Sequence, residues 1–203
     1  MKTRESSMPE APLWESFFTP DAVLRALGLA PTHRAVADFG CGYGTFTIPA
    51  AKIISGAGGS GGAGGGGIVH ALDIDPAMVA ATIARANNDG YTNINAITRD
   101  FVAEGTGLPQ GSVNYVMLFN ILHAELPEVI LREAQRILAP GGLLAIMHWN
   151  HDPATPRGPS LAIRPRPAEC RQWALNIGFE TVTTDPIALP PYHYGIIMRR
   201  APD

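Results

Sequence analysis

The stretch "VADFGCGYGTFT", residues 36–47, decides the fold of this chain. The run "AVADF" at 35–39 is typical of a short buried strand, and "TFTIPAAKII" at 45–54 is typical of a helix. The glycines between them therefore lie in a strand-to-helix turn, where backbone N–H groups and the positive end of the helix dipole can meet a bound anion. This context predicts a ligand-binding loop.

A second glycine-rich stretch, "GAGGSGGAGGGG" at 56–67, matches the dinucleotide fingerprint G-x-G-x-x-G twice. It follows a helix and runs into a strand, which is the reverse of the context that the fingerprint requires. We therefore interpret residues 55–67 as a flexible insertion and not as the ligand site. Without this insertion Asp73 lies about 20 positions after Gly40, the spacing at which a carboxylate holds ribose hydroxyls in Rossmann-like folds.

Two neighbouring carboxylates, Asp73 and Asp75, compete for that ribose role. Asp75 stands directly before Pro76, and this pair is typical of a helix start, because the carboxylate accepts free N–H groups and proline lacks one. Asp73 ends the expected strand and has no such structural explanation. We therefore expect Asp73 to bind the ribose and Asp75 to cap the helix.

Apolar runs of strand type and of helix type alternate along the chain. After the first strand, further strands are expected at 68–73, 93–98, 113–119, 143–149, 179–189 and 192–199. Helices are expected at 20–27, 45–54, 76–88, 121–138 with a bend at Pro127, and 167–178. The alternation predicts a mostly parallel sheet covered by helices on both faces. The last two strands lie too close for a crossover helix and must form an antiparallel hairpin.

Composition restricts the classes of protein to consider. The chain has 203 residues, 46% of them hydrophobic, and a formal net charge of −3, which suits a globular protein and disfavours a nucleic-acid partner. The longest apolar stretch, 143–147, is too short for a membrane span, and the polar start is no signal peptide. Cys41 and Cys170 have no spacing typical of a metal or redox site, so reduced thiols and a cytoplasmic location are expected.

The first thirty residues form a separate part of the expected organisation. Residues 1–30 are an N-terminal arm and helix, and 31–203 form the main domain. Trp14, Phe17 and Phe18 in the arm have two interpretations, an aromatic lid over a ligand or simple packing of the arm onto the core.

Five motifs occur in an order that resembles one enzyme family. They are "DFGCGYG" (38–44), "ALDIDPAMV" (71–79), "TRDF" (98–101), "VNYVMLFNILHAE" (113–125) and "LREAQRILAPGGLLAIMHW" (131–149). Together they resemble class I S-adenosylmethionine (SAM)-dependent methyltransferases of the small-molecule type, similar to the quinone-synthesis group. The resemblance implies a Rossmann-like, seven-stranded sheet with an antiparallel end and a small-molecule methyl acceptor.

The same resemblance implies SAM lying across the carboxyl ends of the first, second and fourth strands. Carried over by position, the residues expected around the methionine part are Asp38, Gly40, Cys41, Gly42 and Gly44. Asp73 would hold the ribose and Ile74 the adenine. Asp100 and Phe101 would meet the adenine amine and ring. Asn120 would line the sulfonium side.

Histidines are the natural candidates for a general base. His123 is the best single choice, because it follows the fourth strand near the expected methyl group. His148, His151 and His193 could also face this edge, although a structural role is favoured for each. Arg157, Arg164 and Arg166 could hold an anionic substrate, although solvated loop charges are the favoured interpretation.

Two other functions are alternatives to this interpretation. A non-catalytic protein that binds SAM or S-adenosylhomocysteine (SAH) would carry the same motifs. An NAD(P)-binding oxidoreductase would need glycine where Thr45 stands in the strand-to-helix turn. The residues leave open the acceptor, its reacting atom, the use of a general base and the oligomeric state.

Overall fold

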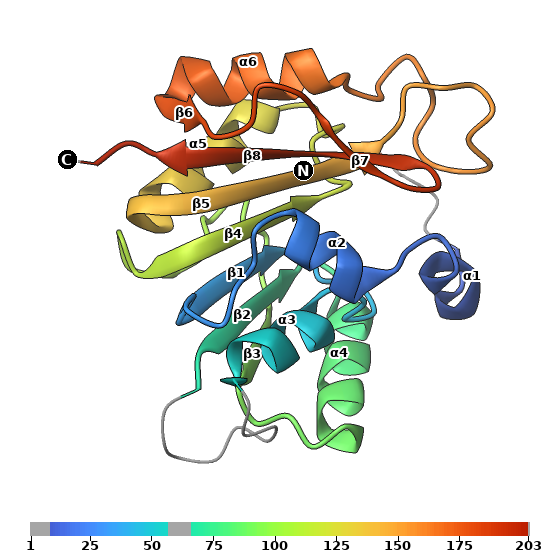
Figure 1. The fold of residues 1–203 in the computed structure, drawn as a ribbon. Helices are drawn as coiled ribbons and strands as arrows, with labels where there is room; N and C mark the ends of the chain where they lie inside the picture. Colours follow the sequence, from blue (N-terminus) through green and yellow to red (C-terminus); the bar gives the residue numbers. More distant parts are fainter. Residues whose placement is uncertain (1–8, 57–65, 203) are drawn as a thin grey trace.

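The computed structural model describes residues 9–56 and 66–202 (Figure 1). Most of the expected glycine-rich insertion, residues 57–65, lies outside the described residues. The described strands are β1 (Ala35–Phe39), β2 (Ile68–Asp73), β3 (Ile94–Thr98), β4 (Val113–Phe119), β5 (Leu138–Trp149), β6 (Phe179–Thr181), β7 (Ile187–Leu189) and β8 (His193–Arg200). The described helices are α1 (Ala11–Glu15), α2 (Pro20–Ala26), α3 (Thr47–Ile54), α4 (Pro76–Asn88), α5 (Pro127–Ile137) and α6 (Pro167–Ile177).

One sheet forms the centre of the molecule, with the strand order β3-β2-β1-β4-β5-β8-β6 and with β7 also paired to β8. The neighbours from β3 to β5 pair in parallel, and β8 pairs antiparallel to β5. This confirms the expected Rossmann-like sheet with an antiparallel end. The carboxyl ends of the parallel strands point to the right in Figure 1, the side on which α1 lies.

The strand expected over 179–189 is divided in two. β6 pairs with the end of β8, where Thr181 lies opposite Met198, and β7 pairs with its start, where Leu189 lies opposite His193. Because β5 already occupies the other side of β8, β6 and β7 follow each other along the same outer edge. The described sheet therefore has eight strands in seven positions.

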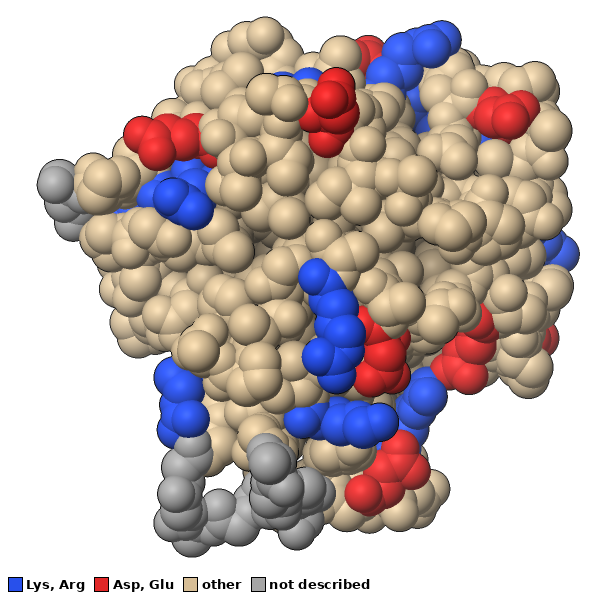
Figure 2. Space-filling model, viewed as in Figure 1, with Lys and Arg blue, Asp and Glu red and all other residues tan. Residues whose placement is uncertain are grey.

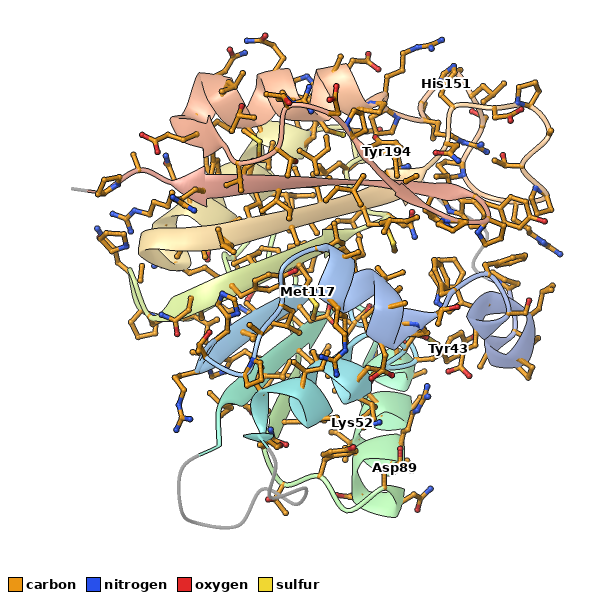
Figure 3. All side chains as sticks on the ribbon, in the orientation of Figure 1. Tyr43, Lys52, Asp89, Met117, His151 and Tyr194 are labelled. Carbon is orange, nitrogen blue, oxygen red and sulfur yellow. The ribbon has the colours of Figure 1, made fainter. Side chains whose placement is uncertain are left out.

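Helices cover both faces of the sheet. Along β4, Val116 and Leu118 pack with α5 and α6 on one face, whereas Tyr115 and Met117 pack with α2 and α3 on the other. Met117 lies at the centre of the molecule in Figure 3. A parallel strand with both faces buried has a nearly continuous apolar sequence, which is what residues 113–119 show.

The predicted start of the helix after β4 is wrong, and the correction changes the surroundings of His123. The helix expected over 121–138 begins at Pro127 and shows no bend there. Proline fits the first turn, where its missing N–H would have no helical partner, and it would disrupt a helix interior. Residues 121–126 therefore form a loop after the carboxyl end of β4, and this loop carries His123.

Other helix ends follow their sequence signals in part: α3 begins at Thr47, two residues later than expected, and α5 passes directly into β5, which begins at Leu138 and not at 143. α6 begins at Pro167 and is followed by Gly178, which has a φ of +97° in the left-handed region that favours glycine. α2 begins after Thr19 as expected, but the Thr19 side chain makes no capping hydrogen bond.

The surface carries charges of both signs. Basic and acidic side chains are interspersed on the face shown in Figure 2. Within the described ranges, no helix is long and apolar enough to cross a membrane. The same ranges contain no group of three or more His, Cys, Asp or Glu residues that could hold a metal ion.

Candidate functional site

The loop after β1 has the backbone geometry that glycine permits. Gly40 and Gly42 have φ angles of +76° and +53°, in the left-handed region. The N–H groups of Gly40 and Cys41 donate to the carbonyl of Leu72 at 2.7 and 3.0 Å. These bonds tie the loop to β2 at the carboxyl edge of the sheet.

A cavity of about 270 Å³ opens at this edge. Its size is near the lower end of the range for small-molecule sites. Most of the predicted cofactor residues line it: Asp38, Gly40, Cys41, Gly42, Asp73, Ile74, Asp100, Phe101 and Asn120. Gly44 does not line the cavity. A Cβ at Gly44 would meet Oγ1 of Thr82 at 3.1 Å, so this glycine allows the loop to pack closely against α4.

Asp73 and Asp75 have the separate environments that the sequence predicts. Oδ2 of Asp73 accepts from the N–H of Gly42 at 2.9 Å, and Oδ1 accepts from the N–H of Asp75 at 3.0 Å. Asp75 caps α4, since its Oδ1 accepts from the N–H of Ala77 at 2.8 Å. Asp73 lines the cavity, and burial is the main cause that raises the pKa of its carboxyl.

The side chain of Asp38 lines the same cavity and is almost fully buried. Burial raises the pKa of its carboxyl to about 7, and the nearby Asp73 acts in the same direction. The hydroxyl of Thr47, the first residue of α3, donates to Oδ2 of Asp38 at 2.6 Å and opposes this rise. A buried carboxylate beside a ligand cavity is suited to a cationic ligand group.

Asn120 has two features typical of a functional position. Its φ of +57° is unusual for a residue other than glycine, although asparagine tolerates it better than most. Its side-chain Oδ1 and Nδ2 are buried and have no hydrogen-bond partner among the described residues. Because Asn120 lines the cavity, a ligand can supply the missing partners.

The predicted adenine residues lie together at another part of the lining. The ring of Phe101 packs against Phe39, with 4.9 Å between ring centroids. Oδ1 of Asp100 accepts from the N–H groups of Val102 and Ala103 at 3.1 and 3.0 Å, which fixes the turn after β3. Ile74 is exposed and lines the same cavity.

The remaining lining of the cavity is mostly apolar and contains four aromatic rings. It includes Trp14, Phe46, Phe119 and Trp149, together with Arg157, Gly158, Pro159 and His123. Phe46 packs edge-on against Phe119 with 4.9 Å between centroids, and Trp14 approaches Trp149 at 6.3 Å. A cavity with polar groups around one part and aromatic rings around another can hold a polar cofactor beside an apolar second ligand.

Comparison with known proteins assigns a family to this arrangement. Residues 32–182, well over half of the chain, match the sequence model of a family described as a methyltransferase domain. The chain belongs to this methyltransferase family. The match confirms the resemblance that the five motifs indicate.

One characterised relative matches part of this chain. The chain is 32% identical over 114 residues to the aklanonic acid methyltransferase DauC of Streptomyces sp. strain C5, an alignment that covers 56% of this chain and 47% of DauC. The match thus spans about half the length of that relative.

Two solved structures share the fold at low sequence identity. A SAM-dependent methyltransferase from Aquifex aeolicus superposes with a TM-score of 0.77 at 21% identity, covering 94% of this chain and 93% of the other. The cyclase SpnF superposes with a TM-score of 0.73 at 13% identity, covering 98% and 85%. At such identities these structures show the fold alone.

The aromatic residues of the N-terminal arm pack onto the core, and one of them also lines the cavity. Trp14 lines the cavity. Phe17 packs against Trp149, and Phe18 packs against Phe46, so these two rings fix the arm to the core. Tyr43, which lies beside α1 in Figure 3, donates its hydroxyl to the carbonyl of Pro9 at 3.3 Å. An ion pair between Arg85 and Glu15 joins α1 to α4.

Both sequence interpretations of Arg164 are wrong. Its guanidinium is buried and holds the loop after β5 by donating to the carbonyls of Pro159, Asn150, Asp152 and Arg157 and to the Thr155 hydroxyl. It therefore neither binds substrate nor lies in solvent. Arg157 is exposed and lines the cavity, whereas Arg166 is exposed outside the lining.

Gly158, in the loop after β5, lies against Trp149, and replacing it tests how tightly this part of the cavity wall is packed. A Cβ at this position would lie 2.8 Å from Cγ of Trp149, at a φ of +106°. We expect Gly158→Ala to lower the free energy of unfolding by about 2–4 kcal/mol, from overpacking and backbone strain together. Urea unfolding measures the change.

Gly141→Ala is the matched control for Gly158→Ala. Gly141 has a φ of +75°, and no atom lies within 4 Å of the position that a Cβ would take there, so this change adds strain without a clash. A loss as large at Gly141 as at Gly158 would show that contact with Trp149 contributes nothing.

Three histidines, His123, His148 and His193, lie close together at this side of the cavity. His123 lines the cavity, and its Nδ1 lies 3.4 Å from Nε2 of His148 in β5. His193 stacks at an angle on Trp149 and is buried, which lowers the pKa of its imidazole to about 3. His151 lies in the loop after β5, where its Nδ1 is 2.9 Å from the carbonyl of Arg164 (Figure 3).

Several residues of the site could not be recognised from the sequence around them. Thr47 holds Asp38 from nine positions away, and Thr82 of α4 donates to the carbonyl of Gly42 at 2.9 Å. Thr45 lines the cavity with a buried hydroxyl that has no partner among the described residues. A hydroxyl residue in an otherwise apolar helix face is the signal that could have indicated Thr47 and Thr82.

Proposed function

We propose that this chain is a SAM-dependent methyltransferase that transfers a methyl group to a small, largely apolar acceptor. The observation that carries the proposal is the cavity at the carboxyl edge, which combines the buried carboxyl of Asp38 and the half-buried carboxyl of Asp73 with the partnerless amide of Asn120. SAM has a cationic methionine amine, a ribose diol and an adenine, and its sulfonium methyl is the group that it supplies for transfer. These needs fit the donor and acceptor groups of the lining.

Each predicted residue has a role consistent with its surroundings. Asp38 would pair with the methionine ammonium, and the Gly40–Gly44 loop would lie along the methionine part. Asp73, held in place by two backbone N–H groups, would accept both ribose hydroxyls. Ile74, Asp100 and Phe101 would surround the adenine.

The cysteines do not suit a nucleophilic role. Cys41 lines the cavity, but burial and the neighbouring Asp38 and Asp73 raise the pKa of its thiol, so the reactive thiolate is disfavoured. Burial also raises the pKa of Cys170 to about 12. Both thiols are free and buried. The proposed cytoplasmic location rests on the cysteine spacing in the sequence. Transfer therefore depends on positioning the acceptor, which can supply roughly 7–11 kcal/mol of the barrier.

The acceptor side favours an aromatic molecule with an acidic group. Aromatic rings line it, and exposed Arg157 is a cation at its rim. Arg99, the other arginine of the lining, is already engaged with Glu104 and the carbonyl of Gly105. The name of the relative DauC refers to an acid as its substrate, which is consistent with this assignment.

A second candidate function is a SAM-binding protein that does not methylate. SpnF shares this fold but is named a cyclase, so the fold by itself does not establish methyl transfer. This observation supports the second candidate. The NAD(P) alternative is disfavoured, since the family match and Thr45 in the turn both oppose it.

Calorimetric titration of the purified protein with SAM, SAH and NADH tests the cofactor. We expect SAM and SAH to bind and NADH not to bind, and the reverse would overturn the proposal. Labelled SAM then tests transfer to 2-naphthol and 6-hydroxy-2-naphthoate, a neutral and an anionic hydroxyarene of similar shape. Binding of SAH without transfer to these or to any acceptor in a cell extract would favour the second candidate.

Replacing Arg157 tests the preference for an acidic acceptor. We expect Arg157→Gln to weaken binding of 6-hydroxy-2-naphthoate to the SAH complex by about three- to tenfold, because an exposed ion pair contributes about 1 kcal/mol. Binding of 2-naphthol should not change. Quenching of tryptophan fluorescence reports both, since Trp14 and Trp149 line the cavity.

Arg166→Gln is the control, because Arg166 is also exposed but lies outside the lining. An equal loss for both naphthols in Arg157→Gln, or an equal loss in Arg166→Gln, would contradict the role of Arg157.

A further inference from the structure

The pair formed by His123 and His148 is not explained by packing alone. His148 is fully buried in β5, and its ring lies behind His123 as seen from the cavity, which only His123 lines. Two imidazoles at 3.4 Å share one hydrogen bond between Nδ1 of His123 and Nε2 of His148. The distance is long for such a bond, and bonds of this kind shorten when a substrate binds.

His148 remains neutral in this environment. Burial is the main cause that lowers the pKa of its imidazole well below the usual range. The groups that face it are His123, His193 and Arg164, all of which disfavour a positive charge, whereas the nearby backbone of Trp149 acts in the other direction. Nδ1 of His148 is buried and has no hydrogen-bond partner among the described residues. A neutral imidazole has one N–H and one acceptor nitrogen, so its partner can be held in a single tautomer.

The hydrogen bond between the two rings can run in either direction, and only one direction leaves His123 able to act as a base. If His148 donated to Nδ1 of His123, a neutral His123 would carry its proton on Nε2 and could accept none there. If His123 donates from Nδ1 to His148, the lone pair of His123 is on Nε2. That nitrogen is then the one that can accept a proton from a molecule in the cavity.

We propose that His148 is a positioning residue that accepts a hydrogen bond from Nδ1 of His123 and so holds His123 as the general base for a hydroxyl acceptor. In this step the acceptor O–H bond breaks and its electron pair stays on oxygen. The proton forms a bond to Nε2 of His123, and the resulting imidazolium keeps its Nδ1–H bond to neutral His148. The inference rests on the proposed function for its acceptor and on the structure for the pair.

The tautomer of His123 tests the pair without any need for activity. Two-bond nitrogen–proton NMR spectra of protein labelled with nitrogen-15 in histidine distinguish Nδ1–H from Nε2–H, with and without SAH. We expect His123 to be the Nδ1–H tautomer in the unaltered protein. Observation of the Nε2–H tautomer would overturn the proposal, and this measurement requires no variant to fold.

Two variants of His148 separate positioning from packing. A glutamine can place its carbonyl oxygen near the position of Nε2, so His148→Gln should keep the Nδ1–H tautomer. His148→Met has no such acceptor and should change His123 to Nε2–H. His70→Gln, a half-buried histidine in β2 outside the cavity, is the control and should leave His123 unaltered.

Kinetics with 2-naphthol connect the pair to the reaction. We expect His148→Met to lower kcat by about 10²-fold with KM within about threefold, since a general base contributes about 10²–10⁴-fold. His148→Gln should recover most of that loss. Equal losses in both variants would indicate a structural role and overturn the proposal. Correct tautomers without any methylation by the unaltered protein would instead contradict the proposed function and leave the pair intact.

Discussion

Replacing Asp73 with asparagine should weaken SAH binding by about 10²-fold or more while leaving the chain folded. The Asp73 carboxylate accepts from two backbone N–H groups and lines the cavity. In the proposed binding mode its charge would act on both the loop and the ribose. A hydrogen bond to a charged group contributes about 1.5–3 kcal/mol, and two ribose hydroxyls are affected. A hundredfold loss corresponds to about 3 kcal/mol. Calorimetry with SAH measures it directly.

Asp75→Asn is a matched control only two residues away. Asparagine caps a helix about as well as aspartate, so α4 should keep its first turn and SAH affinity should change by less than about twofold. Thermal unfolding of both variants checks that the fold is kept. If Asp75→Asn weakened SAH binding as much as Asp73→Asn, the assignment of the ribose to Asp73 would be wrong.

The parts of the molecule that the sequence predicts well depend on local rules. The glycines after β1 could be assigned because strand, turn and helix follow each other within twelve residues. Asp75 could be separated from Asp73 because proline at the next position indicates a helix start. The parallel sheet followed from the alternation of two periodicities.

The parts that could not be predicted depend on contacts between distant segments. Arg164 looked like a surface charge because nothing near it in sequence shows that five loop oxygens converge on its guanidinium. His148 and His123 come from different strand–loop junctions, and only the pairing of β4 with β5 brings them together. The start of α5 was misplaced because the apolar pattern continues on both sides of Pro127.

Asp38 should make cofactor binding depend on pH in a range where most carboxyls do not titrate. Burial raises the pKa of this group in the folded chain to about 7, above its ordinary value of 3.8. The protonated form is therefore favoured by folding, and the destabilisation due to this group grows as the pH rises from about 4 to about 7. By the measure of 1.36 kcal/mol per pKa unit it reaches about 4 kcal/mol at most.

In the proposed binding mode, the ammonium of SAH pairs with the ionised form of Asp38. We therefore expect SAH affinity to rise by up to about tenfold per pH unit below pH 7 and to level off above it. Calorimetry between about pH 5.5 and pH 7.5 gives this curve. Asp38→Asn should flatten the curve, weaken SAH binding at pH 7.5 by about 10²-fold, and raise the melting temperature of the ligand-free protein, because a buried charge is removed.

Thr47→Val determines whether Asp38 is the group responsible. The Thr47 hydroxyl donates to Oδ2 of Asp38 and favours the carboxylate, so its removal should raise the pKa of Asp38 further. The rise in SAH affinity should then occur at higher pH than in the unaltered protein, whereas affinity well above the transition should change little. A curve that keeps its midpoint in Thr47→Val, or one that is flat in the unaltered protein, would show that ionisation of Asp38 is not coupled to binding. A midpoint that moves upward would identify Asp38 as the carboxylate that meets the cofactor amine, because Thr47 donates to this carboxylate in the described structure.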